Sequence, residues 1–467
     1  MHPLVLLCIG MALVVGGILV LRLHAFLALI AGAYCVALLT PAESLRHHAQ
    51  TAVAKGEMGA KAAEKFPGKP AAARVAEAFG RTCGDIGILI AMAAIIGECL
   101  LVSGAAEKIA TVTLRVTGVE RAQWAFFLTS FLLGIPVFLA TLFCLLMPLA
   151  RAMTRKTGRD YLLYVLCVVA GGTITHSLVP PAPGPIFVAG ALGVNLGTMI
   201  IAGSAIGFGA ALFGYLFGSW ANRWLRVEPP PESTADAAAG ASTHDLPPLS
   251  LSLVPVLLPL VLIALNAAFS PSLKDASGAW PALLRTLGDK DMALTLGAAA
   301  GLLLVVRQHR GEKNTVQNAL THGAVIIAIT AAGGAFGGAL QQTGIADAFG
   351  TIIGGAQSWA LPAVFLITAL VRTAQGSATV AMITAAPVAR ALIDSGHTGI
   401  APVYFAIAIG CGSKPFPWMN DAGFWVVARM SGMTEGETLR TMSPMMSLQG
   451  VAGLALTMLA AWLLPLN

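Results

Sequence analysis

The chain has 467 residues, of which 57% are hydrophobic and only 11% are Asp, Glu, Lys or Arg. Soluble domains keep roughly a quarter of their residues charged, because their surface faces water. The composition therefore excludes a soluble protein. The 28 basic and 22 acidic residues also form no cluster with aromatic side chains, so a nucleic-acid surface is not expected.

Charged residues gather in a few places along the chain. Of the 50 charged residues, 32 fall in the stretches 42–81, 151–160, 223–245, 274–291 and 307–313. The apolar windows between them have the length of helices that cross a bilayer. We predict an all-α multi-pass membrane protein in contact with lipid, with about 11 to 12 transmembrane helices joined by wet loops.

The N-terminus and the cysteines exclude other arrangements. The first 21 residues have neither a basic start nor a small-residue cleavage site, so we expect a retained helix rather than a signal peptide. The 7 cysteines form no CxxC pair. Neither a disulfide framework nor a metal site is expected.

The two halves of the chain match when one is shifted by about 240 positions. The matched segments are Gly97–Leu100 with Gly337–Leu340, Pro148–Ala152 with Pro387–Ala391, and Gly184 with Gly423. We predict a first repeat at 1–221, a polar linker at 222–250 and a second repeat at 251–467. The loop 150–160 is strongly basic and predicted cytoplasmic, whereas the matching loop 389–399 is balanced. This difference favours two repeats of inverted topology.

Each half contains an apolar stretch interrupted by helix-breaking residues. Gly134 and Pro136 interrupt 122–149, and Gly376 with Ser377 interrupts 372–392. Broken helices at membrane depth are tolerated where they are buried in protein or line a wet cavity, so matching breaks indicate a binding site. We expect a re-entrant hairpin in each half; the alternative is close helix packing through small residues.

Two Pro-rich polar loops, 173–185 and 412–425, also occupy matching positions. Proline removes a backbone donor and fixes an extended backbone, which leaves carbonyls free to face an ion or a substrate hydroxyl. The residues expected to set this geometry are Pro180, Pro181, Gly184 and Gly423. Simple surface turns are the alternative.

Arg372 is the leading candidate for substrate binding. A guanidinium inside the membrane can bind a carboxylate through two parallel hydrogen bonds, and the helix start near Gly376 and Ser377 offers free amides to an anion. Arg372 has two alternative roles: its side chain can pair with a structural acid or extend to the membrane interface. Further substrate ligands are expected at Thr175, Ser177, Thr379 and Asn420.

His176 and Asp421 lie at comparable places in the two Pro-rich loops. Either side chain can carry a proton or bind an ion, and an ordinary turn or cap role is the alternative for each. Lys414 is expected to anchor the chain at the membrane interface.

Three motifs together resemble the gluconate permease (GntP) family of the ion transporter superfamily. They are Thr-His-Ser-x-Val-Pro-Pro-x-Pro-Gly-Pro within 172–185, Gly376–Ala381 and Asn420–Trp425. The resemblance implies a symporter of the bacterial inner membrane that imports gluconate or related hydroxy-carboxylates with protons. It further implies a homodimer with scaffold and transport parts, alternating access and no cofactor besides the coupling proton.

One position departs from the family pattern. Members usually carry Glu or Asp eight residues before the proline that matches Pro148, and this chain has Ala140 there. A buried carboxylate at that position is a natural proton carrier. Three possibilities remain open: His176 or Asp421 carries the proton, another ion such as sodium drives transport, or transport is uncoupled.

An intramembrane hydrolase is the alternative from another class, with Ser377 as nucleophile and His176 as base. The duplication argues against it, because it repeats the polar breaks whereas a catalytic pair needs one set. We expect a transporter and no enzyme.

Overall fold

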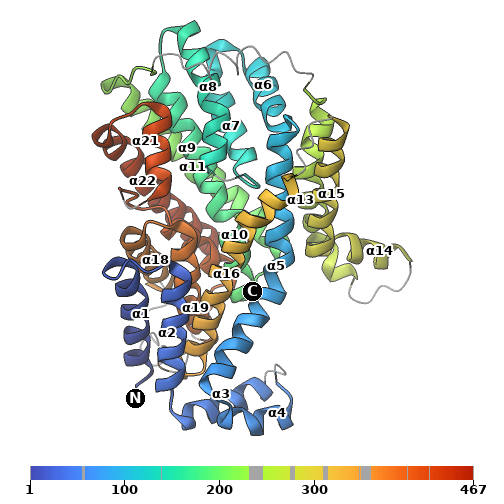
Figure 1. Cartoon of the computed structure of the whole chain (residues 1–467), viewed down its shortest axis with the longest axis vertical. Coiled ribbons are helices and arrows are strands. Elements are labelled where there is room, and N and C mark those ends of the chain that lie inside the picture. The colour runs from blue at the N-terminus through green and yellow to red at the C-terminus, as the bar shows by residue number, and fades with distance from the viewer. Residues whose placement is uncertain are drawn as a thin grey trace.

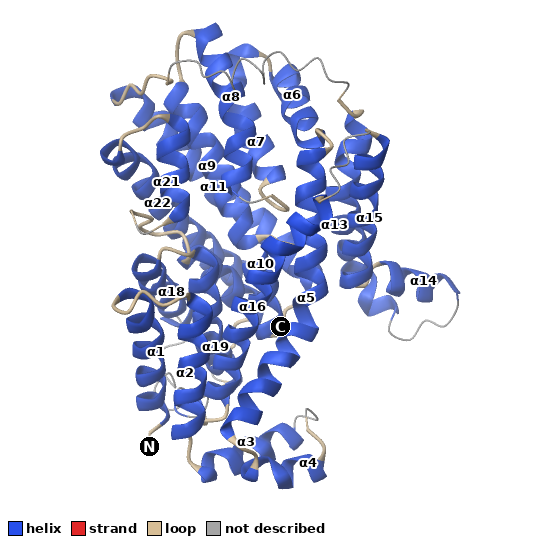
Figure 2. Cartoon of the chain, in the orientation of Figure 1, coloured by secondary structure: helices blue, strands red, loops and turns tan. Residues whose placement is uncertain are grey.

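The computed structural model describes residues 2–54, 58–137, 139–230, 246–273, 279–308, 314–345, 348, 359–396, 398–419 and 421–465. All regular elements in these ranges are helices (Figure 2). The first half contains α1 (Pro3–Leu19), α2 (Ala25–Leu39), α3 (Ala42–Ala54), α4 (Ala60–Lys65), η1 (Phe66–Gly68), α5 (Ala71–Val102), α6 (Ala105–Thr117), η2 (Val119–Arg121), α7 (Ala122–Leu133), α8 (Leu139–Thr157), α9 (Tyr161–Leu178), α10 (Pro183–Leu192) and α11 (Leu196–Trp224). The second half contains α13 (Leu249–Leu273), α14 (Ala279–Leu287), α15 (Lys290–Arg307), α16 (Thr315–Gln341), α18 (Ala360–Gln375), α19 (Ala378–Asp394), α20 (Pro402–Gly412), α21 (Ala422–Ser431) and α22 (Glu435–Leu463). The predicted all-α fold is confirmed.

The helices make the chain a multi-pass membrane protein. Within the described residues, six helical stretches are long and apolar enough to cross a bilayer, or seven if the bent pair α2 and α3 forms one span. This number is lower than the roughly 11 to 12 transmembrane helices predicted from the apolar windows of the sequence. Several windows hold shorter helices, such as α18 with 16 residues and α20 with 11.

The polar stretch 42–81, expected as a wet loop, is largely helical. α2 and α3 meet at an angle of 102°, and α3 buries Leu45, Ala49 and Ala52 while exposing its charged side chains. This amphipathic spacing lets a polar segment form a helix on the protein surface.

The long helices α5 and α16 pack against each other near the middle of the molecule (Figure 1). They run in opposite directions, since Gly323 of α16 lies against Ala94 of α5 whereas Gly338 lies against Ala78. Glycine and alanine allow such close approach of two backbones. α2 packs against α16, and α15 packs against α5. The inverted topology of the two repeats stays a prediction.

The two halves are interlocked rather than separate. α10 of the first half packs against α19, and α21 of the second half packs against α8. Arg151 of α8 donates a hydrogen bond to the Met430 carbonyl at the end of α21, and Tyr161 donates to the Ser431 carbonyl at 2.9 Å. The repeats proposed at 1–221 and 251–467 therefore share one core. Most of the predicted linker, positions 231–245, lies outside the described residues.

Candidate functional site

The first interrupted helix ends at Leu133, and α8 begins at Leu139, with Ala140 in its first turn. A Cβ on Gly134 would lie 2.6 Å from Thr175 Oγ1 and 2.7 Å from Gly172 Cα, both in α9. A Cβ on Gly97 of α5 would lie 2.7 Å from the carbonyl oxygen of Pro136. The break is thus pressed between α5 and α9.

Substituting Gly134 by alanine is expected to lower the thermal stability of the detergent-solubilised protein. The added methyl meets backbone atoms that cannot rotate away, and overpacking of this kind costs about 1–3 kcal/mol. Gly190→Ala in α10 is the matched control, because a Cβ there meets nothing within 4 Å. Equal unfolding temperatures for the two variants would contradict the close packing of the first break.

The second break lies between α18 and α19. Gly376 ends α18 with a φ of +75°, a conformation that glycine adopts without strain. Ser377 caps α19, since its Oγ accepts a hydrogen bond from the Val380 amide at 3.3 Å. Thr379 follows in the first turn, beside Gly184 of α10, which packs against Met382. One of the amides expected to receive an anion is therefore already used by Ser377.

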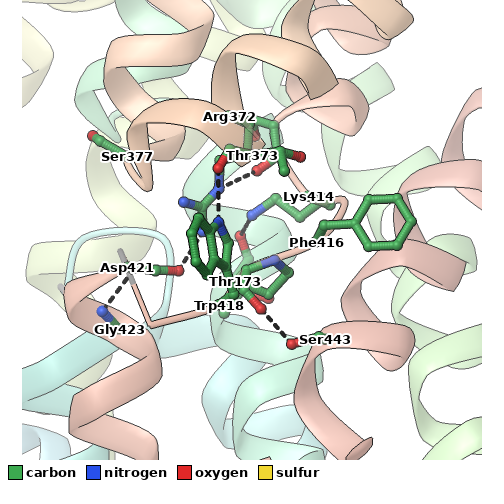
Figure 3. Close-up of polar contacts among 12 residues, drawn as sticks. Thr173, Arg372, Thr373, Ser377, Lys414, Phe416, Trp418, Asp421, Gly423 and Ser443 are labelled. Carbon is green, nitrogen blue, oxygen red and sulfur yellow. Dashed lines mark hydrogen bonds and ion pairs between the residues drawn. The ribbon is translucent and has the colours of Figure 1, made fainter. Parts of the chain in front are cut away.

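Arg372 reaches from the end of α18 into the interior and is 2% exposed. Its Nε donates to the Ser413 carbonyl at 3.0 Å, and its Nη2 forms an ion pair with Asp421 (Figure 3). Asp421 also caps α21 by accepting the Gly423 amide at 2.8 Å. The structure thus brings together Arg372 and Asp421, which were expected to have separate roles. Nη1 of Arg372 is buried and has no hydrogen-bond partner within the described residues.

Lys414 was expected at the membrane interface, and this expectation is wrong. Its side chain is buried, with 2% of the residue exposed, and its Nζ donates to the Thr173 carbonyl of α9 at 2.6 Å. The neighbouring Ser413 donates its hydroxyl to Ser177 Oγ at 3.1 Å. These contacts hold the end of α20 against α9, so the lysine points inward and cannot reach a surface.

The Pro-rich loops are shorter than predicted. The last turns of α9 contain four residues that were expected in the first loop: Thr173, Thr175, His176 and Ser177. Only residues 179–182 lie between α9 and α10. Thr175 Oγ1 donates to the Gly171 carbonyl at 3.0 Å, so its hydroxyl is satisfied inside the helix. Pro180 and Pro181 are buried between the two helices.

The second loop spans 413–421 between α20 and α21. Trp418 Nε1 donates to the Thr373 carbonyl at 2.8 Å, and Ser443 Oγ of α22 donates to the Pro417 carbonyl. Figure 3 shows Trp418 in front of Arg372 and beside Asp421. The loop therefore covers the buried ion pair. Asn420 lies outside the described residues.

Ser377 stands apart from this cluster. In Figure 3 the side chain of Ser377 points away from Arg372, and its Oγ serves as the cap of α19. His176 is half-buried on α9, one position before Ser177. The hydrolase alternative required Ser377 as a free nucleophile, and its capping role is a structural one.

Gln375 is a residue that the sequence patterns did not single out. Both polar atoms of its side chain, Nε2 and Oε1, are buried without a hydrogen-bond partner in the part of the chain that the structure describes. It ends α18, three residues after Arg372 and directly before Gly376. Its position in the last turn before the break was the signal available in the sequence.

A cavity of about 1040 Å³ lies beside this region, at the other end of α10 and α19. Its walls include Arg74 and Arg81 of α5, Phe187 of α10, Gly334 of α16 and Arg390 of α19. α10 and α19 begin next to the second break and end at this cavity, so the cavity lies at the far end of these two helices from Arg372.

Comparison with known proteins gives a consistent result. A profile of the GntP family permeases matches residues 58–463. The chain is 32% identical to a gluconate permease of Pseudomonas aeruginosa over 83% of this chain and 87% of that protein. It is 29% identical to the low-affinity gluconate transporter of Escherichia coli K12, covering 90% of this chain and 94% of that protein. The structure of MtrF from Neisseria gonorrhoeae, which represents a class of antimetabolite efflux pumps, has a similar fold, with a TM-score of 0.60 at 18% identity over 84% of each chain. The family match over most of the chain confirms the resemblance seen in the three motifs, and the chain belongs to the GntP permease family.

Proposed function

We propose that the protein imports gluconate or a related hydroxy-carboxylate across the bacterial inner membrane together with protons. Family membership supports a permease, and the relatives named above as gluconate transporters support the substrate class. The homodimer implied by the resemblance stays a prediction.

The charge balance of the buried cluster carries this proposal. Arg372 and Lys414 are each 2% exposed; Asp421 forms an ion pair with Arg372, and Lys414 donates to the Thr173 carbonyl. Burying one ion without a counter-charge in an apolar bundle costs a desolvation free energy of about several kcal/mol. A bound carboxylate removes that excess, and Nη1 of Arg372, which has no partner among the described residues, offers it a donor.

The Arg372–Asp421 pair also suggests how a proton is coupled to the substrate. Ionised Asp421 and the substrate carboxylate compete for the same guanidinium. When Asp421 takes up a proton it releases Arg372, which then binds the substrate. One proton thus enters with one carboxylate, and Asp421 replaces the acid that is missing at Ala140. His176, in the last turn of α9, is the second candidate for carrying the proton.

Alternating access then requires the helices around the breaks to move. α10 and α19 pack on each other, whereas α5 and α16 form the long crossed pair. We assign the former to a transport part and the latter to a scaffold.

Uptake of labelled gluconate by the purified protein in liposomes tests the proposal. We expect accumulation when the outside is more acidic than the inside, with acidification of the lumen on addition of gluconate, and no dependence on sodium. Accumulation driven by sodium alone would reject proton coupling but retain transport. Absence of uptake and of exchange under every gradient would reject the proposed function.

A further inference from the structure

We propose that Gln375 recognises the hydroxyl group next to the substrate carboxylate and so sets the preference for hydroxy-acids. This inference rests on the proposed function and adds a specificity-determining residue to the site.

Gln375 and Arg372 lie three positions apart in the last turn of α18. Residues three apart on a helix are neighbours on its surface. Arg372 is 2% exposed with Nη1 unpartnered, and both polar atoms of Gln375 are buried, again without a partner in the described ranges. The last turn of this broken helix therefore carries three buried polar atoms that have no partner among the described residues.

Such a group is costly unless a ligand completes it. A buried amide without hydrogen bonds loses the interactions that it makes with water in the unfolded chain. Two buried glutamines each have at least one partner: Gln342 accepts a hydrogen bond from Arg74, and Gln449 Nε2 donates to the Ala170 carbonyl at 3.0 Å, while Gln449 Oε1 has no partner within the described residues. Gln375 differs from both because neither of its polar atoms is bonded, at the place where the helix breaks.

The chemistry of these atoms specifies the ligand. Nη1 of Arg372 and Nε2 of Gln375 only donate, and a carboxylate only accepts. Oε1 of Gln375 only accepts, so it needs a donor on the ligand. The two polar atoms of one planar amide lie side by side, as do a carboxylate oxygen and the hydroxyl on the adjacent carbon of a 2-hydroxy-acid. A carboxylate without that hydroxyl leaves Oε1 unpaired and binds less well.

Competition between gluconate and its 2-deoxy analogue for uptake into liposomes tests this inference. We expect the wild type to prefer gluconate by about tenfold, the effect of about one lost hydrogen bond. Gln375→Met keeps the side-chain length without its polar atoms and is expected to reduce the preference to about twofold or less. Gln317→Met, on an exposed face of α16, is the matched control and is expected to keep the wild-type preference.

The outcomes separate this inference from the proposed function. A wild type that carries neither acid overturns the proposed function. If the wild type prefers gluconate and the Gln375→Met variant keeps the same preference as the wild type, only the role of Gln375 is overturned. Gln375→Asn, which keeps the amide on a shorter stem, provides a second variant if the Met variant shows no cooperative thermal unfolding. It is expected to fall between the wild type and complete loss of preference, and an unchanged preference in Gln375→Asn also counts against the inference.

Discussion

Replacing Arg372 by lysine is expected to lower gluconate uptake by about 100-fold, the effect of losing charge-assisted hydrogen bonds worth about 3 kcal/mol. Lysine keeps the positive charge opposite Asp421 but loses the planar guanidinium. It cannot bond the Ser413 carbonyl, Asp421 and the substrate at once.

Arg372→Ala is expected to abolish uptake and also to lower stability, because removing one partner of a buried pair costs about 3–5 kcal/mol. Uptake per amount of folded protein, with the unfolding temperature of each variant, measures both effects.

Arg159→Ala provides the control for this result. Arg159 also pairs with an aspartate, Asp160, but its side chain is 70% exposed, and exposed pairs contribute about 0–1 kcal/mol. We expect the control to keep uptake within about twofold of the wild type. If Arg372→Lys transported as well as the control, Arg372 would have no role in binding the substrate carboxylate.

Asp421→Asn is expected to separate exchange from accumulation. Asparagine still caps α21 through the Gly423 amide, because Asn and Asp are similarly good N-caps. It cannot take up a proton or compete as an anion for Arg372. The variant should therefore exchange labelled for unlabelled gluconate at near wild-type rates, while the accumulation driven by a pH gradient is lost. Parallel exchange and gradient-driven uptake assays in liposomes check this prediction.

Asp289→Asn is the matched control for Asp421→Asn. Asp289 is exposed and caps α15 by accepting the amides of Asp291 and Met292 at 3.0 and 3.2 Å. The same substitution in the same kind of cap should leave both assays unchanged. Full accumulation by Asp421→Asn would place the proton elsewhere, with His176 as the next residue to substitute.

The positions of the breaks could be predicted because their signals are local. Gly376 and Ser377 interrupt an apolar run, and glycine followed by a capping residue marks a helix end and a new start within a few positions. The outer bounds were harder to predict. Thr175 was assigned to a loop, yet a threonine can donate to a carbonyl of its own helix, and nothing in the sequence shows which occurs.

The partners of the charged side chains depend on contacts between distant segments. Arg372 and Asp421 are 49 positions apart, and their pairing follows from the course of α20 between them. Lys414 illustrates the same limit. A lysine beside an apolar segment usually reaches the interface, and only the packing of α20 against α9 shows that this one is buried. That Gln375 has no side-chain partner among the described residues likewise becomes visible only in three dimensions.

The interlocking of the two halves has a consequence for synthesis. Arg74 of α5 donates to Gln342, which the ribosome adds 268 residues later, and Tyr161 precedes its acceptor Ser431 by 270. The first half therefore enters the bilayer before the acceptors of several of its polar groups exist. Arg74 also donates to the carbonyls of Lys69 and Ala37 in the first half, so these earlier contacts can hold its side chain before α16 arrives. A chain truncated before α16 would lack the hydrogen bonds to Gln342 and Ser431, so assembly of this permease is completed late, after the second half has been inserted.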